Sequence, residues 1–168
     1  MNGNCFLIGL ILLVIGMLGF VPPIVKAISF NVGCGGYLKS AADAPTVEMA
    51  RTELDTAIEY IDNHGLTYGH SHLIIPNRQA DVGYWSDRIK SARIDLDTIT
   101  EESTGLEKSN MLMKLRETLL DEGESGTEVT TPPHISVFPA QWLWTIACLF
   151  GVIFGLLGII LMAGSFAV

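Results

Sequence analysis

The chain has 168 residues, of which 49% are hydrophobic and only 17% charged, and its formal net charge at pH 7 is −8. Every lysine, arginine, aspartate and glutamate lies between Lys26 and Glu128, so both ends of the chain are uncharged. Phosphate binding needs clustered basic side chains, so this acidic balance argues against a nucleic-acid partner. The partition of charge predicts an all-α membrane protein in which two transmembrane helices flank one soluble helical domain, a helical hairpin or three-helix bundle.

The first predicted element is a transmembrane helix in residues 1–29. Residues 5–25 form an uncharged apolar run, and about 20 apolar residues are enough to cross a bilayer. A cleaved signal peptide is the alternative interpretation, but residues 1–4 lack the usual basic side chain and the apolar run exceeds a typical signal. We expect a retained span, with Lys26 as an anchor at the membrane surface.

A glycine-rich stretch, NVGCGG at residues 31–36, follows this span. Its spacing matches neither a P-loop nor a dinucleotide-binding motif, and Asn31 stands where lipid attachment to Cys34 would want leucine. We expect a joint in which glycines adopt unusual dihedrals and the chain turns into the domain. Cys34 is then a small buried side chain or, on the exported side, a candidate for an intermolecular disulfide. The predicted joint comprises Pro22, Pro23, Gly33, Cys34, Gly35 and Gly36.

An acidic helical domain is predicted in residues 30–121, with helices at about 45–63, 81–102 and 105–121. Apolar residues recur there at three- and four-residue steps, which is the pattern of a helix with one buried face. The predicted core positions are Val47, Ala50, Leu54, Ala57, Ile61, Val82, Trp85, Ile89, Ala92, Leu96, Ile99, Leu112, Leu115 and Leu119.

The ends of these helices carry recognisable capping residues. Asp43 precedes the first helix and Asp81 precedes the second, and aspartate side chains accept hydrogen bonds from free helix amides. Thr104 and Glu107 have the spacing of a capping box at the start of the third helix. Gly65 is suited to the left-handed conformation that ends the first helix.

The connections between these elements lack helical periodicity. In the long loop after the first helix, residues 73–75 are apolar and we expect them to fold back onto the bundle end. Residues 122–141 are rich in turn-forming, proline and acidic residues, which predicts an irregular linker back to the membrane. The second transmembrane helix is predicted in residues 142–168, with Trp142 and Trp144 as anchors in the headgroup layer.

Both apolar runs contain small residues at spacings that allow helices to approach closely in lipid. We interpret these small residues as surfaces for self-association, with packing of the two spans inside one subunit as the alternative. Neither run contains an ionisable side chain, which argues against proton or ion transport through them. The predicted packing residues are Gly9, Gly16, Gly19, Ala147, Gly151, Gly155 and Gly158.

No catalytic or cofactor-binding constellation is expected. His64, His70 and His72 are candidate metal ligands, but no HExxH motif or cysteine pair accompanies them, so solvated loop histidines are the simpler interpretation. The acidic residues of the linker region lack the EF-hand pattern and are interpreted as a solvated flank. They are Glu117, Asp121, Glu122, Glu124 and Glu128.

Three functions fit this architecture. The first is a structural membrane protein that assembles into a homo-oligomer. The second is an accessory subunit of a larger complex, or a ligand-binding sensor module that acts through a partner; the order of anchor, helical bundle and anchor resembles the layout of bacterial chemoreceptor input modules. The third is a histidine-dependent metal enzyme, which has the least support. Lys26 and Lys39 favour a cytoplasmic loop, but residues 30–137 contain nine basic and eighteen acidic side chains, and this net charge of −9 favours the exported side of a bacterial-type inner membrane.

Overall fold

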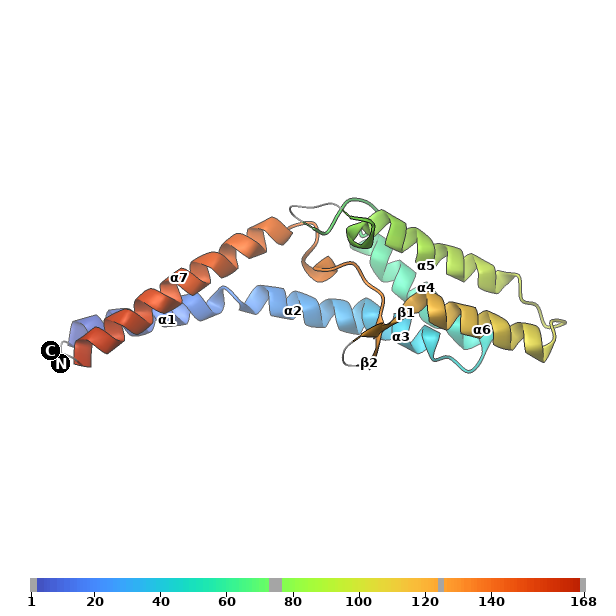
Figure 1. Ribbon diagram of the computed structural model, residues 1–168, viewed down its shortest axis with the longest axis horizontal. Helices are drawn as coiled ribbons and strands as arrows, with labels where there is room; N and C mark the ends of the chain where they lie inside the picture. The colour runs from blue at the N-terminus through green and yellow to red at the C-terminus, as the bar shows by residue number, and fades with distance from the viewer. Residues whose placement is uncertain (1–2, 73–76, 124–125, 167–168) are drawn as a thin grey trace. The chain divides into compact units, whose positions relative to one another are not determined.

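The computed structural model describes residues 3–72, 77–123 and 126–166, and it is mostly helical (Figure 1). Contacts between Cα atoms divide the chain into two compact units. One consists of Met1–Ile28 and Pro139–Val168, and the other of Ser29–Phe138.

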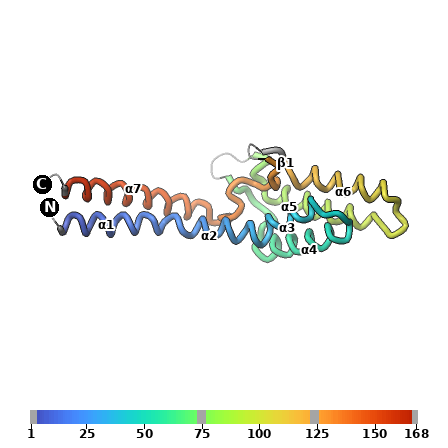
Figure 2. Tube along the Cα trace, turned by 90° about the horizontal axis from the view of Figure 1, so that it is seen from below, coloured from blue at the N-terminus to red at the C-terminus, as the bar shows by residue number. Residues whose placement is uncertain are grey.

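The first unit is a pair of long apolar helices, α1 (Gly3–Leu18) and α7 (Gln141–Phe166), together with the start of α2 (Val21–Phe30). Helices α1 and α7 lie side by side in both views (Figures 1 and 2). Two helical stretches, Asn4–Ala42 and Gln141–Ser165, are long and apolar enough to cross a membrane by length and composition. Most of their side chains are exposed: in the most apolar 18-residue segment of each stretch, 11% of the residues are buried.

The first apolar run contains a break that the sequence analysis did not predict. Helix α1 ends at Leu18, and a turn separates it from α2. Pro22 and Pro23 occupy the first turn of α2. Backbone N–H groups in a first turn have no acceptor within the helix, so the N–H that proline lacks costs no hydrogen bond there. Because those prolines cannot donate to the carbonyls of the preceding turn, the chain tightens there through hydrogen bonds from Gly19 N–H to Gly16 O and from Phe20 N–H to Met17 O.

The second unit contains the three predicted helices: α4 (Val47–Asn63), α5 (Val82–Asp97) and α6 (Gly105–Leu119). The predicted stripes lie in one hydrophobic core, with Ile99 and Leu112 only partly buried. Helix α5 ends five residues before its predicted end at residue 102. The side chain of Arg51 donates to the Leu96 and Ile99 carbonyls at 2.5 and 2.6 Å, which satisfies acceptors that the end of the helix leaves free.

The predicted caps are present with one exception. Asp81 accepts from Tyr84 N–H at 3.0 Å, Thr104 and Glu107 form the capping box, and Gly65 has φ of 65°. The cap of α4 was wrongly predicted, because Thr46 rather than Asp43 accepts from the Met49 amide, at 3.2 Å.

A short helix, α3 (Gly36–Ala42), precedes α4 and continues a π-helical segment, η1 (Asn31–Gly35). We expected unusual dihedrals in this glycine-rich stretch, but the backbone is helical, with φ of −58° at Gly35 and −61° at Gly36. Helix α3 packs on α4 and buries Leu38, Ala41 and Ala42 in the core. Burial of this apolar face offsets the low helix propensity of the glycines.

A two-stranded antiparallel hairpin follows α6, where the sequence analysis expected an irregular linker. Strand β1 (Leu120–Gly123) pairs with β2 (Gly126–Val129), and Leu120 opposes Val129 in the register. Leu120 is buried in the core and Val129 packs against it. Two short 3₁₀ turns, η2 (Arg78–Ala80) and η3 (Ile135–Val137), complete this unit, and the expected folding back of residues 73–75 falls outside the described residues.

The capping box makes the stability of α6 dependent on pH. Hydrogen bonds from the Thr104 backbone amide and hydroxyl lower the pKa of Glu107. A carboxyl whose pKa is lowered by folding stabilises the folded state above its unfolded pKa of about 4.3, and this contribution disappears as the pH falls through the folded pKa. We expect Glu107→Gln to flatten the fall of the melting temperature as the pH drops below about 5. Glu102→Gln, which changes a neighbouring exposed carboxylate, should leave the dependence as in the wild type, and a flattening by both variants would contradict this role.

Candidate functional site

Small residues line the surface between α1 and α7. A Cβ atom built on Gly16 would lie 2.6 Å from Gly151 O, and one built on Gly9 would lie 2.8 Å from Gly158 O. A Cβ on Gly19 would lie 3.0 Å from Ala147 O. A side chain larger than hydrogen at any of these positions would therefore force the two helices apart.

Gly155 differs from the other predicted packing residues. A Cβ atom built on it has no heavy atom within 4 Å among the described residues, although its backbone N lies near Gly16. The other predicted packing glycines contact the facing span inside one chain, as the alternative interpretation expects, whereas Gly155 leaves an open position on α7.

The three predicted interfacial anchors have different surroundings. Lys26 is exposed, and so is Trp142. Trp144 is half-buried, and its indole N–H has no hydrogen-bond partner among the described residues.

The residues of the predicted joint lie in two places. Pro22 and Pro23 begin α2, whereas the other four belong to η1 and the start of α3. Gly33 lies against Tyr60 so closely that a Cβ atom would overlap the Tyr60 ring. The Cys34 side chain is fully buried, with its Sγ 4.0 Å from Ala57 O, so it is not accessible to a cysteine of a second chain.

The candidate metal ligands do not form a site in the described part of the chain, where no three His, Cys, Asp or Glu side chains are grouped to hold an ion. The His64 ring stacks on Tyr60 with 3.8 Å between centroids, and its Nδ1 lies 2.9 Å from Tyr60 O. His72 lies against His134 rather than His64, with ring centroids 6.2 Å apart.

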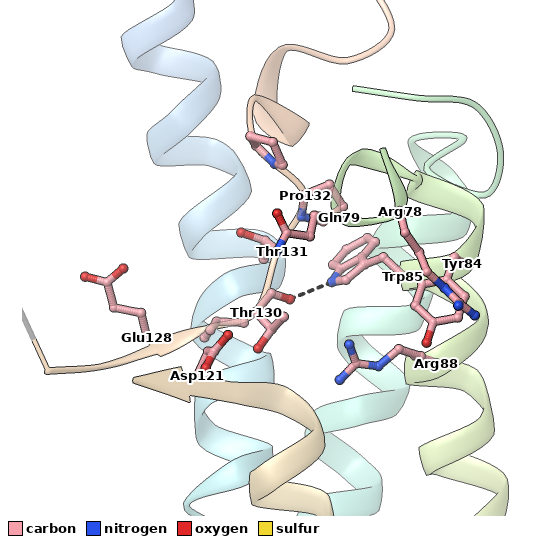
Figure 3. Close-up of a pocket in the computed structure, with 12 residues that line it drawn as sticks. Arg78, Gln79, Tyr84, Trp85, Arg88, Asp121, Glu128, Thr130, Thr131 and Pro132 are labelled. Atoms are coloured by element: carbon pink, nitrogen blue, oxygen red, sulfur yellow. Dashed lines mark hydrogen bonds between the residues drawn. The ribbon is translucent and has the colours of Figure 1, made fainter. Parts of the chain in front are cut away.

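A cavity of about 620 Å³ lies in the second unit, between α5 and the hairpin with the segment that follows it (Figure 3). Trp85 is nearly completely buried at this site, and its indole N–H donates to Thr130 O at 2.8 Å, which ties α5 to the segment after β2. The lining residues are Arg78, Gln79, Tyr84, Trp85, Arg88, Asp121, Glu128, Val129, Thr130, Thr131, Pro132 and Pro133.

The two arginines of this cavity differ from the other three in the chain. Arg51, Arg93 and Arg116 pair with carboxylates, and the two hydrogen bonds from Arg93 to Asp55, at 2.7 and 3.1 Å, raise the pKa of Arg93. Arg78 and Arg88 form no ion pair with any carboxylate that the structure describes. Their positive charges are thus not neutralised by a described carboxylate, and they are available to an anionic group of a ligand.

Local contacts hold both cavity arginines. The Arg78 guanidinium lies 4.5 Å from the centroid of the Tyr84 ring, a cation–π contact, and one Nη of Arg88 donates to Thr118 O at 2.6 Å. Sequence reasoning missed this site because residues 78–88 and 121–133 meet only in the folded chain. The one local signal is that Arg88, unlike Arg93, has no acidic residue three or four positions away on its helix.

These features define a mostly helical chain with two helices long and apolar enough to cross a membrane and, in its second unit, a cavity that charged side chains help to line. A comparison with protein-family models finds no match, and searches of curated proteins and of solved structures find no significant match either.

Proposed function

We propose that this protein is a small two-span membrane protein with a structural, non-catalytic role, in which paired spans anchor a helical domain that docks on a membrane partner. The observation that carries the proposal is the close backbone approach of α1 and α7 at Gly9–Gly158 and Gly16–Gly151. In lipid, such contacts between small residues are a principal source of helix association. The exposed apolar side chains of both helices suit a surrounding of lipid tails.

This geometry favours an anchored accessory subunit over a homo-oligomer built through the glycine faces. The predicted packing glycines other than Gly155 contact the facing span within one chain, so they do not remain for contacts between chains. The apolar stripes of α4, α5 and α6 likewise pack into a single core and are not free for partner helices. We place the acidic domain on the exported side of the membrane, because its net negative charge is repelled by an anionic inner leaflet.

The particle mass of the full chain in mild detergent tests the accessory role. We expect a protein mass of 18.2 kDa after correction for bound detergent, with the chain recovered in the membrane fraction after an alkaline wash. A discrete multiple of 18.2 kDa would instead support the homo-oligomer, and recovery in the soluble fraction would reject the anchored protein altogether.

A further inference from the structure

Charged residues of both signs line the cavity beside α5, the positive ones on one wall formed by η2 and α5 and the negative ones on the hairpin. Arg78 and Arg88 project from η2 and α5, whereas Asp121 and Glu128 belong to the hairpin (Figure 3). We propose that this cavity binds a small zwitterion of amino-acid or dipeptide size, with its carboxylate at the arginines and its ammonium group towards the hairpin carboxylates. This inference stands apart from the anchoring role, because it concerns the second unit alone.

The arginine wall provides the groups that recognise a carboxylate. A guanidinium has five N–H donors in a planar fork that matches a carboxylate in two-point contact. Arg88 uses one Nη for Thr118 O and makes no other hydrogen bond within the described part of the chain, and its guanidinium extends towards Thr130 in Figure 3. The Tyr84 ring supports the Arg78 guanidinium, which reduces the conformational entropy that Arg78 loses when a ligand binds.

The hairpin wall provides the groups that recognise a cation. Asp121 and Glu128 are direct partners in the antiparallel register, and like charges in such a pair repel each other. A bound ammonium group relieves this repulsion. Asp121 has another interaction already, but a carboxylate has about four lone-pair positions and can accept a further hydrogen bond.

The size and total charge of the cavity restrict the ligand further. Its two arginines and two carboxylates sum to no net charge, so the carboxylates repel a polyanion and the arginines repel a polycation. A volume of about 620 Å³ holds more than the two charged groups. Trp85 and Pro132 supply apolar surface against which a ligand side chain packs.

The test is a binding titration of the full chain in detergent with the standard L-amino acids and their glycyl dipeptides, read by calorimetry. For the best binder, the analogues that lack only the amino group or only the carboxylate are titrated next; for phenylalanine these are phenylpropionate and phenethylamine. We expect each analogue to bind at least about tenfold more weakly than the zwitterion. Absence of binding by every zwitterion, or equal binding by the deaminated acid, would overturn the proposal.

Variants assign the binding to this cavity. Arg78→Gln and Arg88→Gln should each weaken zwitterion binding about tenfold, and Asp121→Asn should weaken the zwitterion but not the deaminated acid. Arg88→Gln removes the hydrogen bond to Thr118 O and could disturb folding. The structure shows no hydrogen bond from Arg78 to the backbone, so Arg78→Gln tests the arginine wall without this side effect. Lys108→Gln removes a positive charge outside the cavity and should bind as the wild type does. If the Arg78→Gln variant and the Asp121→Asn variant both bind the zwitterion with wild-type affinity, the ligand binds elsewhere and the site is rejected.

Discussion

Replacing Gly33 by alanine is expected to lower the free energy of unfolding of the helical unit by about 1–3 kcal/mol, the usual cost of overpacking. The added methyl group would overlap two ring atoms of Tyr60. That ring is held on both sides, because it stacks on His64 and meets the Phe30 ring edge-on at 6.0 Å between centroids. The ring can therefore move only by giving up these contacts. Urea unfolding of the full chain in detergent, followed by circular dichroism, measures the change.

Two controls separate this overlap from a general effect of changing a helical glycine. Gly105→Ala adds a methyl group in α6 that would meet no atom of the described residues within 4 Å, and it should stabilise the chain by about 0.4–1 kcal/mol through the unfolded state. In a Tyr60→Leu background, Gly33→Ala should cost much less than in the wild type, because the smaller side chain leaves room. Equal effects of Gly33→Ala in both backgrounds would show that Tyr60 is not the cause.

The sequence was sufficient to predict α4, α5 and α6 because their signals are local. Each apolar stripe repeats at three- and four-residue steps, and residues such as Asp81 and Thr104 act on amides within three positions of themselves. The cap of α4 was wrongly predicted because local signals did not distinguish its two candidates. Asp43 and Thr46 are both suitable capping residues, and the backbone geometry selects Thr46.

Helix α3 and the hairpin could not be predicted from local signals. Glycines at positions 33, 35 and 36 lower helix propensity, and their helical state depends on packing against α4, which is distant in the sequence. The hairpin carries acidic residues that are typical of a solvated loop, and of its described side chains Leu120 and Val129 belong to or pack against the hydrophobic core. Two apolar positions are too few to show an alternating strand pattern.

The cavity shows a further limit of sequence reasoning. Asp121 and Glu128 were interpreted as part of a solvated acidic flank, and they remain exposed, but the hairpin places them across a cavity from Arg78 and Arg88. The two pairs lie more than thirty residues apart in the sequence, so their proximity depends on the packing of the hairpin beside α5. The signs of the four charges were visible in the sequence, whereas their arrangement was not.

Replacing Gly151 by isoleucine should separate α1 from α7, whereas the same change at Gly155 should not. A Cβ atom on Gly151 would lie 2.7 Å from Gly16 O and 3.1 Å from the Phe20 ring, and backbone oxygen cannot move aside as a side chain can. A Cβ on Gly155 meets no described atom within 4 Å. The two variants add the same side chain to the same helix one turn apart, so each controls for the lipid exposure and helix propensity of the other.

Cys148 provides a native probe for this separation. Its thiol is half-buried, with Sγ 3.9 Å from Gly19 O on the facing segment, so pairing of the spans shields it from reagents. We expect N-ethylmaleimide to label Cys148 at least about tenfold faster in Gly151→Ile than in the wild type, as a loss of 1.4 kcal/mol in pairing would produce. Gly155→Ile should label at the wild-type rate, with mass spectrometry of peptides distinguishing Cys148 from Cys5. Faster labelling in both variants, or in neither, would show that the spans do not pair through Gly16 and Gly151, and the case for a closed anchor within one chain would be lost.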